Sequence, residues 1–126
     1  MTARILAAIV GLFYTVTGLW SFFLPTSFYS TVATFTPYNL HLLHDVGAFQ
    51  VGMGLVLLAA AATGRGLLPA LFGVLIGSLL HLVAHTLDIR LGGHPGTDLP
   101  ALAAIAAALG VAFYLELRRP SAPTSR

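Results

Sequence analysis

Four long apolar segments fill most of this 126-residue chain. An apolar helix of about 20 residues is long enough to cross the hydrocarbon core of a bilayer. Charge, Pro or Gly bounds each segment, so the four are separate rather than parts of one run. The predicted spans cover residues 5–24, 42–62, 67–87 and 99–117. We therefore expect an all-α protein, a bundle of four transmembrane helices that forms a single domain over residues 1–119.

The low charge content argues against the common soluble classes of protein. Charged residues make up 8% of the chain and hydrophobic residues 57%, whereas about 25% of the residues of an average soluble chain are charged. So few charges could not cover a globular surface. The largest basic cluster is Arg118-Arg119, so we expect no nucleic-acid partner. Without cysteine, the chain has no disulfide, no thiolate metal site and no cysteine nucleophile.

The arginines predict the orientation of the chain. With a cytoplasmic N-terminus, Arg90 alone lies outside, and the other arginines obey the positive-inside rule. Those on the inside are Arg4, Arg65, Arg118, Arg119 and Arg126. We therefore expect a multi-pass protein of the cell membrane with both termini in the cytoplasm. The tail over residues 120–126 is predicted to be a disordered cytoplasmic segment.

The loops predict which helices are neighbours. The tight turn Thr63-Gly64-Arg65-Gly66 makes the second and third spans an antiparallel hairpin. The segment 25–39 is longer and rich in aromatic residues, which favour the headgroup layer. We expect it to lie on the outer interface, with a short helix after Pro25 and with Asn39 as the N-cap of the second span.

Small residues predict where the helices approach one another. Lipid tails are as apolar as leucine, so membrane helices associate through close backbone packing at small side chains. The third span carries Gly73-x-x-x-Gly77, and we expect this stripe to contact another helix of the same chain; an oligomer interface is the alternative. The other spans contribute further small residues to a compact bundle: Gly11, Gly18, Gly47, Gly52, Gly54 and the alanines of 101–108.

Two polar clusters lie within or beside the spans. His44 and Asp45 stand at the start of the second span, and His81 and His85 stand near the end of the third. The hairpin places both sets at its outer end. The histidines continue the stripe of Gly73 and Gly77 at four-residue steps, so imidazoles and glycines face nearly the same way. We expect His81 and His85 to form one connected cluster with His44 or Asp45, which Gln50 could extend.

Three interpretations of this cluster stay open. It could be a structural hydrogen-bond network, with Asp88 paired to Arg90 nearby, or a path for protons or a solute. It could also bind a transition metal or a haem, because imidazoles spaced i, i+4 can share one ion. The candidate metal ligands are His44, Asp45, His81 and His85.

Part of the sequence resembles a known family of membrane proteins. The glycine-rich segment 47–58, the Thr63-Gly-Arg65 turn and the apolar third span are similar to small DoxX-like four-helix integral membrane proteins. The segment 37–50 also resembles small actinobacterial membrane proteins of unassigned activity. The resemblance implies a four-helix membrane fold. The DoxX name belongs to a subunit of a thiosulfate:quinone oxidoreductase, but the histidines lie outside the family pattern, so quinone chemistry carries over to no residue here.

Two functional hypotheses follow. The first is a non-enzymatic accessory or ligand-binding module in the lipid bilayer, with a membrane-protein partner or a second copy of the chain. The second is a redox accessory subunit that binds metal or haem near the quinone pool. A Soret band or a stoichiometric metal in the purified protein would favour the second hypothesis over the first.

Overall fold

The computed structural model describes residues 1–119, which form five α-helices. Four of them are long and apolar enough to cross a membrane, which indicates a multi-pass membrane protein and confirms the predicted all-α class. The expected tail 120–126, including Arg126, lies outside the described residues. The helices are α1 (Thr2–Phe23), α2 (Pro25–Thr31), α3 (Leu40–Thr63), α4 (Leu67–Leu87) and α5 (Pro95–Leu117).

Local sequence signals set the ends of α2, α3 and α4. Pro25 begins the short helix α2, as predicted, at a position where its missing N–H costs nothing. Asn39 caps α3, because its Oδ1 accepts a hydrogen bond from Leu42 N at 3.1 Å. Gly64 ends α3 at φ 71° and Gly66 precedes α4 at φ 66°, in the left-handed region that favours glycine. The expected cap, short helix and tight turn are therefore all present.

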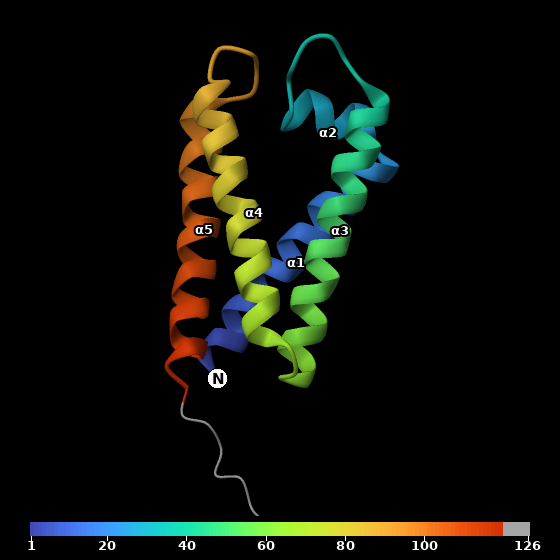
Figure 1. Cartoon of the computed structure of the whole chain (residues 1–126). Helices are drawn as coiled ribbons and strands as arrows, with labels where there is room; N and C mark the ends of the chain where they lie inside the picture. Colours follow the sequence, from blue (N-terminus) through green and yellow to red (C-terminus); the bar gives the residue numbers. More distant parts are fainter. Residues whose placement is uncertain (120–126) are drawn as a thin grey trace, which may run out of the picture.

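The helices associate as two pairs rather than as one evenly packed bundle. The most extensive contact joins α1 to α3, the next joins α4 to α5, and α1 also packs against α5. Figure 1 shows that α3 and α4 meet at their connecting turn and diverge away from it. The hairpin is thus antiparallel, as expected, but its two helices do not pack along their length.

A glycine crossing holds α1 against α3. Gly11 lies opposite Gly54, and Gly18 lies opposite Gly47, with two helical turns between the glycines of each helix. A Cβ atom on Gly11 would lie 2.9 Å from Gly54 O, and one on Gly18 would lie 2.8 Å from Gly47 O. Side chains at these positions would force the two backbones apart. The expectation that glycines on these two spans mediate helix contact is confirmed at this crossing.

The glycines of α4 behave differently, and the prediction that they form a close crossing within the chain is wrong. A Cβ atom on Gly73 would meet nothing within 4 Å, and one on Gly77 would meet only Met53 Sδ at 3.9 Å. Gly52 on α3 faces open space as well. The physical reason is that α3 already presents Gly47 and Gly54 to α1, and the helix that packs most closely on α4 is α5.

Buried hydroxyl groups form hydrogen bonds between helices, both between the two pairs and within one of them. Tyr14 Oη and Ser78 Oγ are 2.8 Å apart, and this hydrogen bond joins α1 to α4. Ser21 Oγ donates to Leu43 O at 2.7 Å and ties α1 to the start of α3. A buried polar group without a partner is costly, so these bonds fix the register of the helices.

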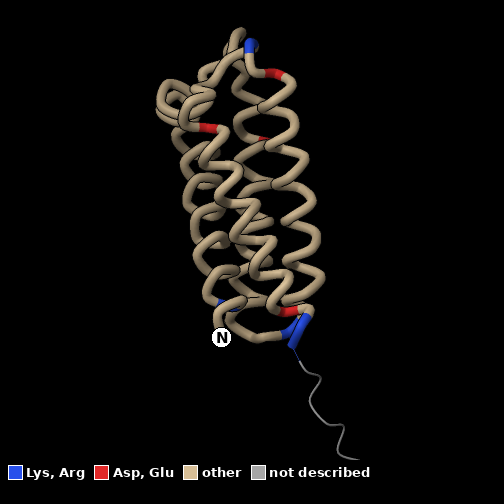
Figure 2. Tube along the Cα trace, turned by 90° about the vertical axis from the view of Figure 1, so that its left-hand side faces the viewer, with Lys and Arg blue, Asp and Glu red and all other residues tan. Residues whose placement is uncertain are grey.

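The molecule has two chemically different ends. The turn end comprises the start of α1, the 63–66 turn and the end of α5, and it carries Arg4, Arg65, Arg118 and Arg119. The loop end comprises residues 24–39 and 88–94, where Gly93 N donates to Thr34 O at 2.8 Å and so joins the two loops. Figure 2 shows the charged residues at these ends or in the adjoining turns of the helices, with a long uncharged middle between them.

Candidate functional site

The divergence of α3 from α4 leaves a groove on the side of the molecule. The groove has a volume of about 370 Å³ and an almost wholly apolar lining. Phe49 on its rim is 74% exposed, a large fraction for an aromatic side chain. Gly52 and Gly73 form part of the floor, so helical backbone is accessible from outside. The lining residues are Ala48, Phe49, Gly52, Met53, Val56, Pro69, Ala70, Gly73 and Val74.

The two histidines of α4 lie side by side toward the loop end of that helix. The ring centroids of His81 and His85 are 4.7 Å apart, and the ring planes meet at 69°. His81 is exposed and His85 is half-buried. One α-helical turn separates them, so the i, i+4 geometry expected from the sequence is present. The pair could supply two nitrogen ligands to a metal ion bound on this face.

The polar residues at the start of α3 have other partners. His41 Nε2 lies 3.4 Å from Asp45 Oδ2, an exposed pair within one helix. The His44 ring packs on Phe22 of α1, with centroids 5.1 Å apart. Gln50 Oε1 accepts a hydrogen bond from Thr17 Oγ1 of α1 at 3.0 Å and therefore does not extend a cluster toward α4.

The structure does not support a single histidine and aspartate cluster. Within residues 1–119, no three His, Asp or Glu side chains come close enough together to hold a metal ion. The reason is the pairing of the helices. Because α3 packs along α1 and α4 packs along α5, the polar side chains of α3 and those of α4 are separated where the hairpin opens. The four predicted ligands, His44, Asp45, His81 and His85, are therefore not gathered into a group of three or more metal ligands within residues 1–119.

One ion pair lies at the end of α5. Arg119 Nη1 is 3.4 Å from Glu116 Oε1. The alternative pairing of Asp88 with Arg90 is not among the ion pairs of the described residues. Arg118 instead lies over the ring of Tyr114, 5.0 Å from its centroid.

Sequence reasoning missed the role of Arg4 in the structure. Its Nε donates to Ala61 O and its Nη2 donates to Ala62 O, both at 2.6 Å. These carbonyls lie in the last turn of α3, where backbone oxygens have no partner within the helix. An arginine ahead of an apolar run indicates orientation, but nothing in the sequence indicates which helix end it caps.

No family model, no curated protein and no solved structure matches the chain. The resemblance to DoxX-like proteins therefore stays a prediction.

Proposed function

We propose that this protein is a non-enzymatic accessory module of the membrane that docks a transmembrane helix of another protein in the groove between α3 and α4. The observation that carries the proposal is the accessible backbone at Gly52, Gly73 and Gly77. By contrast, Gly11, Gly18, Gly47 and Gly54 are all in backbone contact between α1 and α3.

The energetics of helix association in lipid support a helix as the occupant. Apolar side chains gain little by leaving lipid for protein, so docking requires close backbone packing at small residues. Both helices of the groove contribute a glycine, Gly52 from α3 and Gly73 from α4. The side chains of Phe49 and Met53 add apolar surface beside them, and the flexible Met53 can adjust to the shape of a partner. A helix seated there would replace loosely packed lipid chains with continuous van der Waals contact along two helices.

Cross-linking in native membranes tests this function. A photoreactive amino acid at Gly73 should cross-link to protein, whereas one at the lipid-exposed Ile9 of α1 should cross-link mainly to lipid. Mass spectrometry of the product identifies the partner, and a cross-link to a second copy of this chain would instead make the groove an oligomer interface. Adding Gly77→Leu should reduce the protein cross-link by about tenfold, because the added side chain keeps the docked backbone away. Equal lipid labelling at both positions would overturn the proposal.

A second candidate function rests on the paired imidazoles of His81 and His85. Two ligands on one helix face bind a transition metal well only when other groups complete the coordination. A partner docked beside α4 could supply them, which would make the protein a metal-binding or redox accessory subunit. Metal analysis and an absorbance spectrum of the protein purified with its partner distinguish this function from helix docking alone.

A further inference from the structure

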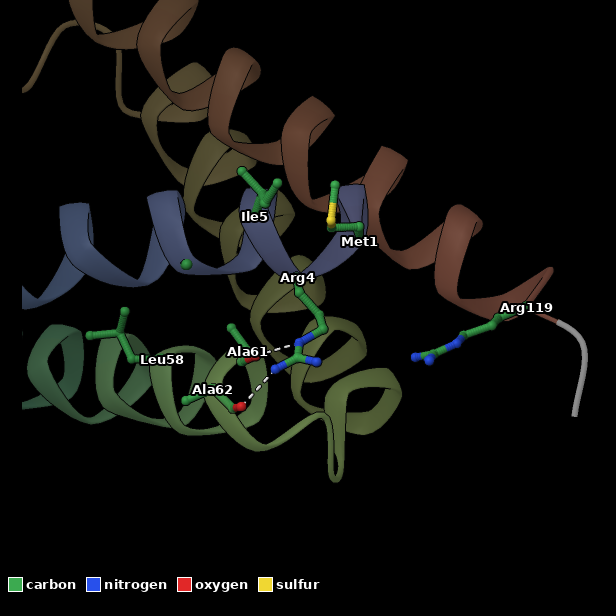
Figure 3. A pocket seen from close by; sticks show the side chains of 8 residues that line it. Met1, Arg4, Ile5, Leu58, Ala61, Ala62 and Arg119 are labelled. Atoms are coloured by element: carbon green, nitrogen blue, oxygen red, sulfur yellow. Dashed lines mark hydrogen bonds between the residues drawn. The ribbon is translucent and has the colours of Figure 1, made fainter. Parts of the chain in front are cut away.

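A second hollow lies at the turn end of the molecule, away from the groove. It is bounded by the start of α1, the last turns of α3 and the end of α5, and its volume is about 540 Å³ (Figure 3). The lining residues are Met1, Arg4, Ile5, Ala8, Leu58, Ala61, Ala62 and Arg119.

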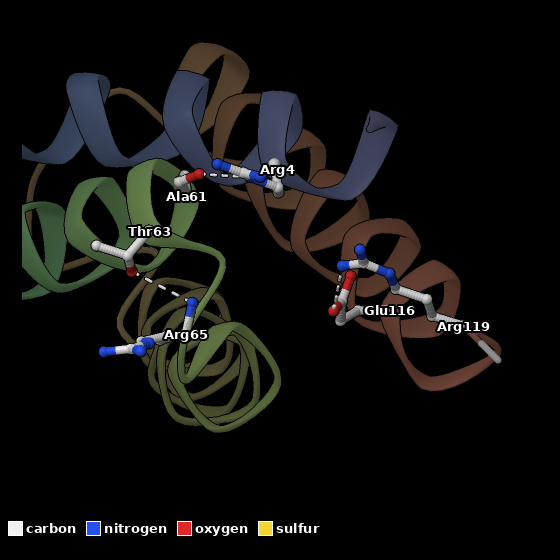
Figure 4. Close-up of polar contacts among 6 residues, drawn as sticks. All are labelled: Arg4, Ala61, Thr63, Arg65, Glu116 and Arg119. Carbon is white, nitrogen blue, oxygen red and sulfur yellow. Dashed lines mark hydrogen bonds and ion pairs between the residues drawn. The ribbon is translucent and has the colours of Figure 1, made fainter. Parts of the chain in front are cut away.

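Two guanidinium groups lie on the walls of this hollow. The two hydrogen bonds to α3 hold Arg4 in place but involve only backbone carbonyls, and within residues 1–119 no carboxylate forms an ion pair with it. Arg119 extends into the hollow from the opposite side, as Figure 3 shows. Its Nη1 also lies 3.4 Å from Oε1 of Glu116, a carboxylate that is only 16% exposed (Figure 4), so part of the Arg119 charge is balanced within α5. Arg4, Arg119 and Glu116 together leave one net positive charge at this hollow, which would favour an anion between the two guanidinium groups.

The remaining wall is apolar. Ile5 and Ala8 follow Arg4 along α1, and Leu58 faces them from α3. Ile5 is 50% exposed, so this wall is open to the hydrocarbon that surrounds the spans. The hollow thus combines cations at the ends of the helices with an apolar surface that leads from them toward the middle of the membrane.

This combination matches a phospholipid rather than a free anion. Basic pockets between transmembrane helices at the membrane surface bind acidic lipid headgroups. We propose that Arg4 and Arg119 bind the phosphate of an anionic phospholipid, whose acyl chain lies along Ile5, Ala8 and Leu58. A free phosphate ion would use the arginines but gain nothing from the apolar wall. This site is independent of helix docking between α3 and α4.

Native mass spectrometry of the full chain, released from detergent with added lipid, tests the site. We expect retention of phosphatidylglycerol over phosphatidylcholine. Arg119→Gln should weaken phosphatidylglycerol binding about fivefold, the factor that corresponds to about 1 kcal/mol for each basic residue at an anionic membrane surface. Arg65→Gln is the matched control, because Arg65 lies at the same end but does not line the hollow (Figure 4). Its binding should equal that of the wild type.

Two further measurements distinguish binding of the lipid from binding of free phosphate and from loss of the fold. In Ala8→Trp, the larger side chain fills the hollow at its apolar wall. This variant should retain less lipid, while its helix content, measured by circular dichroism, stays unchanged. Glycerol phosphate, which lacks acyl chains, should not displace the lipid at equimolar concentration. Equal retention of the two phospholipids, equal effects of Arg119→Gln and Arg65→Gln, or displacement by equimolar glycerol phosphate would each overturn the proposal.

Discussion

At the scale of single residues, the hydrogen bond between Tyr14 and Ser78 is the clearest polar contact in the interior. Both side chains are buried, and the bond joins helices that are distant in sequence. Tyr14→Phe should lower the free energy of unfolding by about 1 kcal/mol, because Ser78 loses its partner on α1. The double variant with Ser78→Ala should cost less than the sum of the single changes. Ser78→Ala alone leaves the buried Tyr14 hydroxyl without its partner, whereas Ser78 keeps its hydrogen bond to Val74 O in Tyr14→Phe.

Reversible denaturation in mixed detergent micelles measures this coupling as a double-mutant cycle. Thr86→Ala is a suitable control, because the exposed Thr86 hydroxyl bonds to Leu82 O of its own helix and so joins no two helices. Strict additivity of the two buried changes would mean that the bond does not couple α1 to α4.

At the scale of helices, the sequence predicts each element better than it predicts the contacts between elements. The four spans, the cap at Asn39 and the turn at Gly64 follow from length, charge and local backbone chemistry. The neighbours of each helix cannot be predicted in the same way. In lipid, an apolar face does not select a particular partner helix, and a glycine shows only that the backbone of some other helix could approach it. The short turn places α3 beside α4 only at the turn itself. The expected histidine cluster is not found within residues 1–119, because its two sets of side chains lie at the end where α3 and α4 diverge.

The glycines of α1 and α4 should therefore respond in opposite ways to the same substitution. In Gly18→Ala, the new Cβ would lie 2.7 Å from Val51 N, so α1 and α3 must separate and thermal stability in detergent should fall by several degrees. In Gly73→Ala, the Cβ enters open space, and alanine favours the helix by about 1 kcal/mol over glycine. Stability should then stay equal or rise. Equal losses in the two variants would contradict the assignment of α1–α3 as the glycine crossing.

At the scale of the whole molecule, the charges of the two ends predict how the bundle sits in the membrane. The turn end carries four of the described arginines, Arg4, Arg65, Arg118 and Arg119, against Arg90 at the loop end. Basic residues near the ends of spans are retained in the cytoplasm, so the turn end should face inward. The lipid bound between Arg4 and Arg119 would then come from the cytoplasmic leaflet, where anionic lipids attract basic residues.

Single cysteines test this orientation directly, because the native chain contains none. Thr97 at the loop end and Thr63 at the turn end are both exposed, so cysteine at either position is reachable from its own side. A membrane-impermeant maleimide should label Thr97→Cys in intact cells and Thr63→Cys only after permeabilisation. The opposite pattern would place the arginine-rich end outside and assign the hollow to the outer leaflet. Labelling of both positions in intact cells would contradict the membrane-spanning arrangement itself, because Thr63 ends α3 at the turn end and Thr97 lies in the first turn of α5 at the loop end.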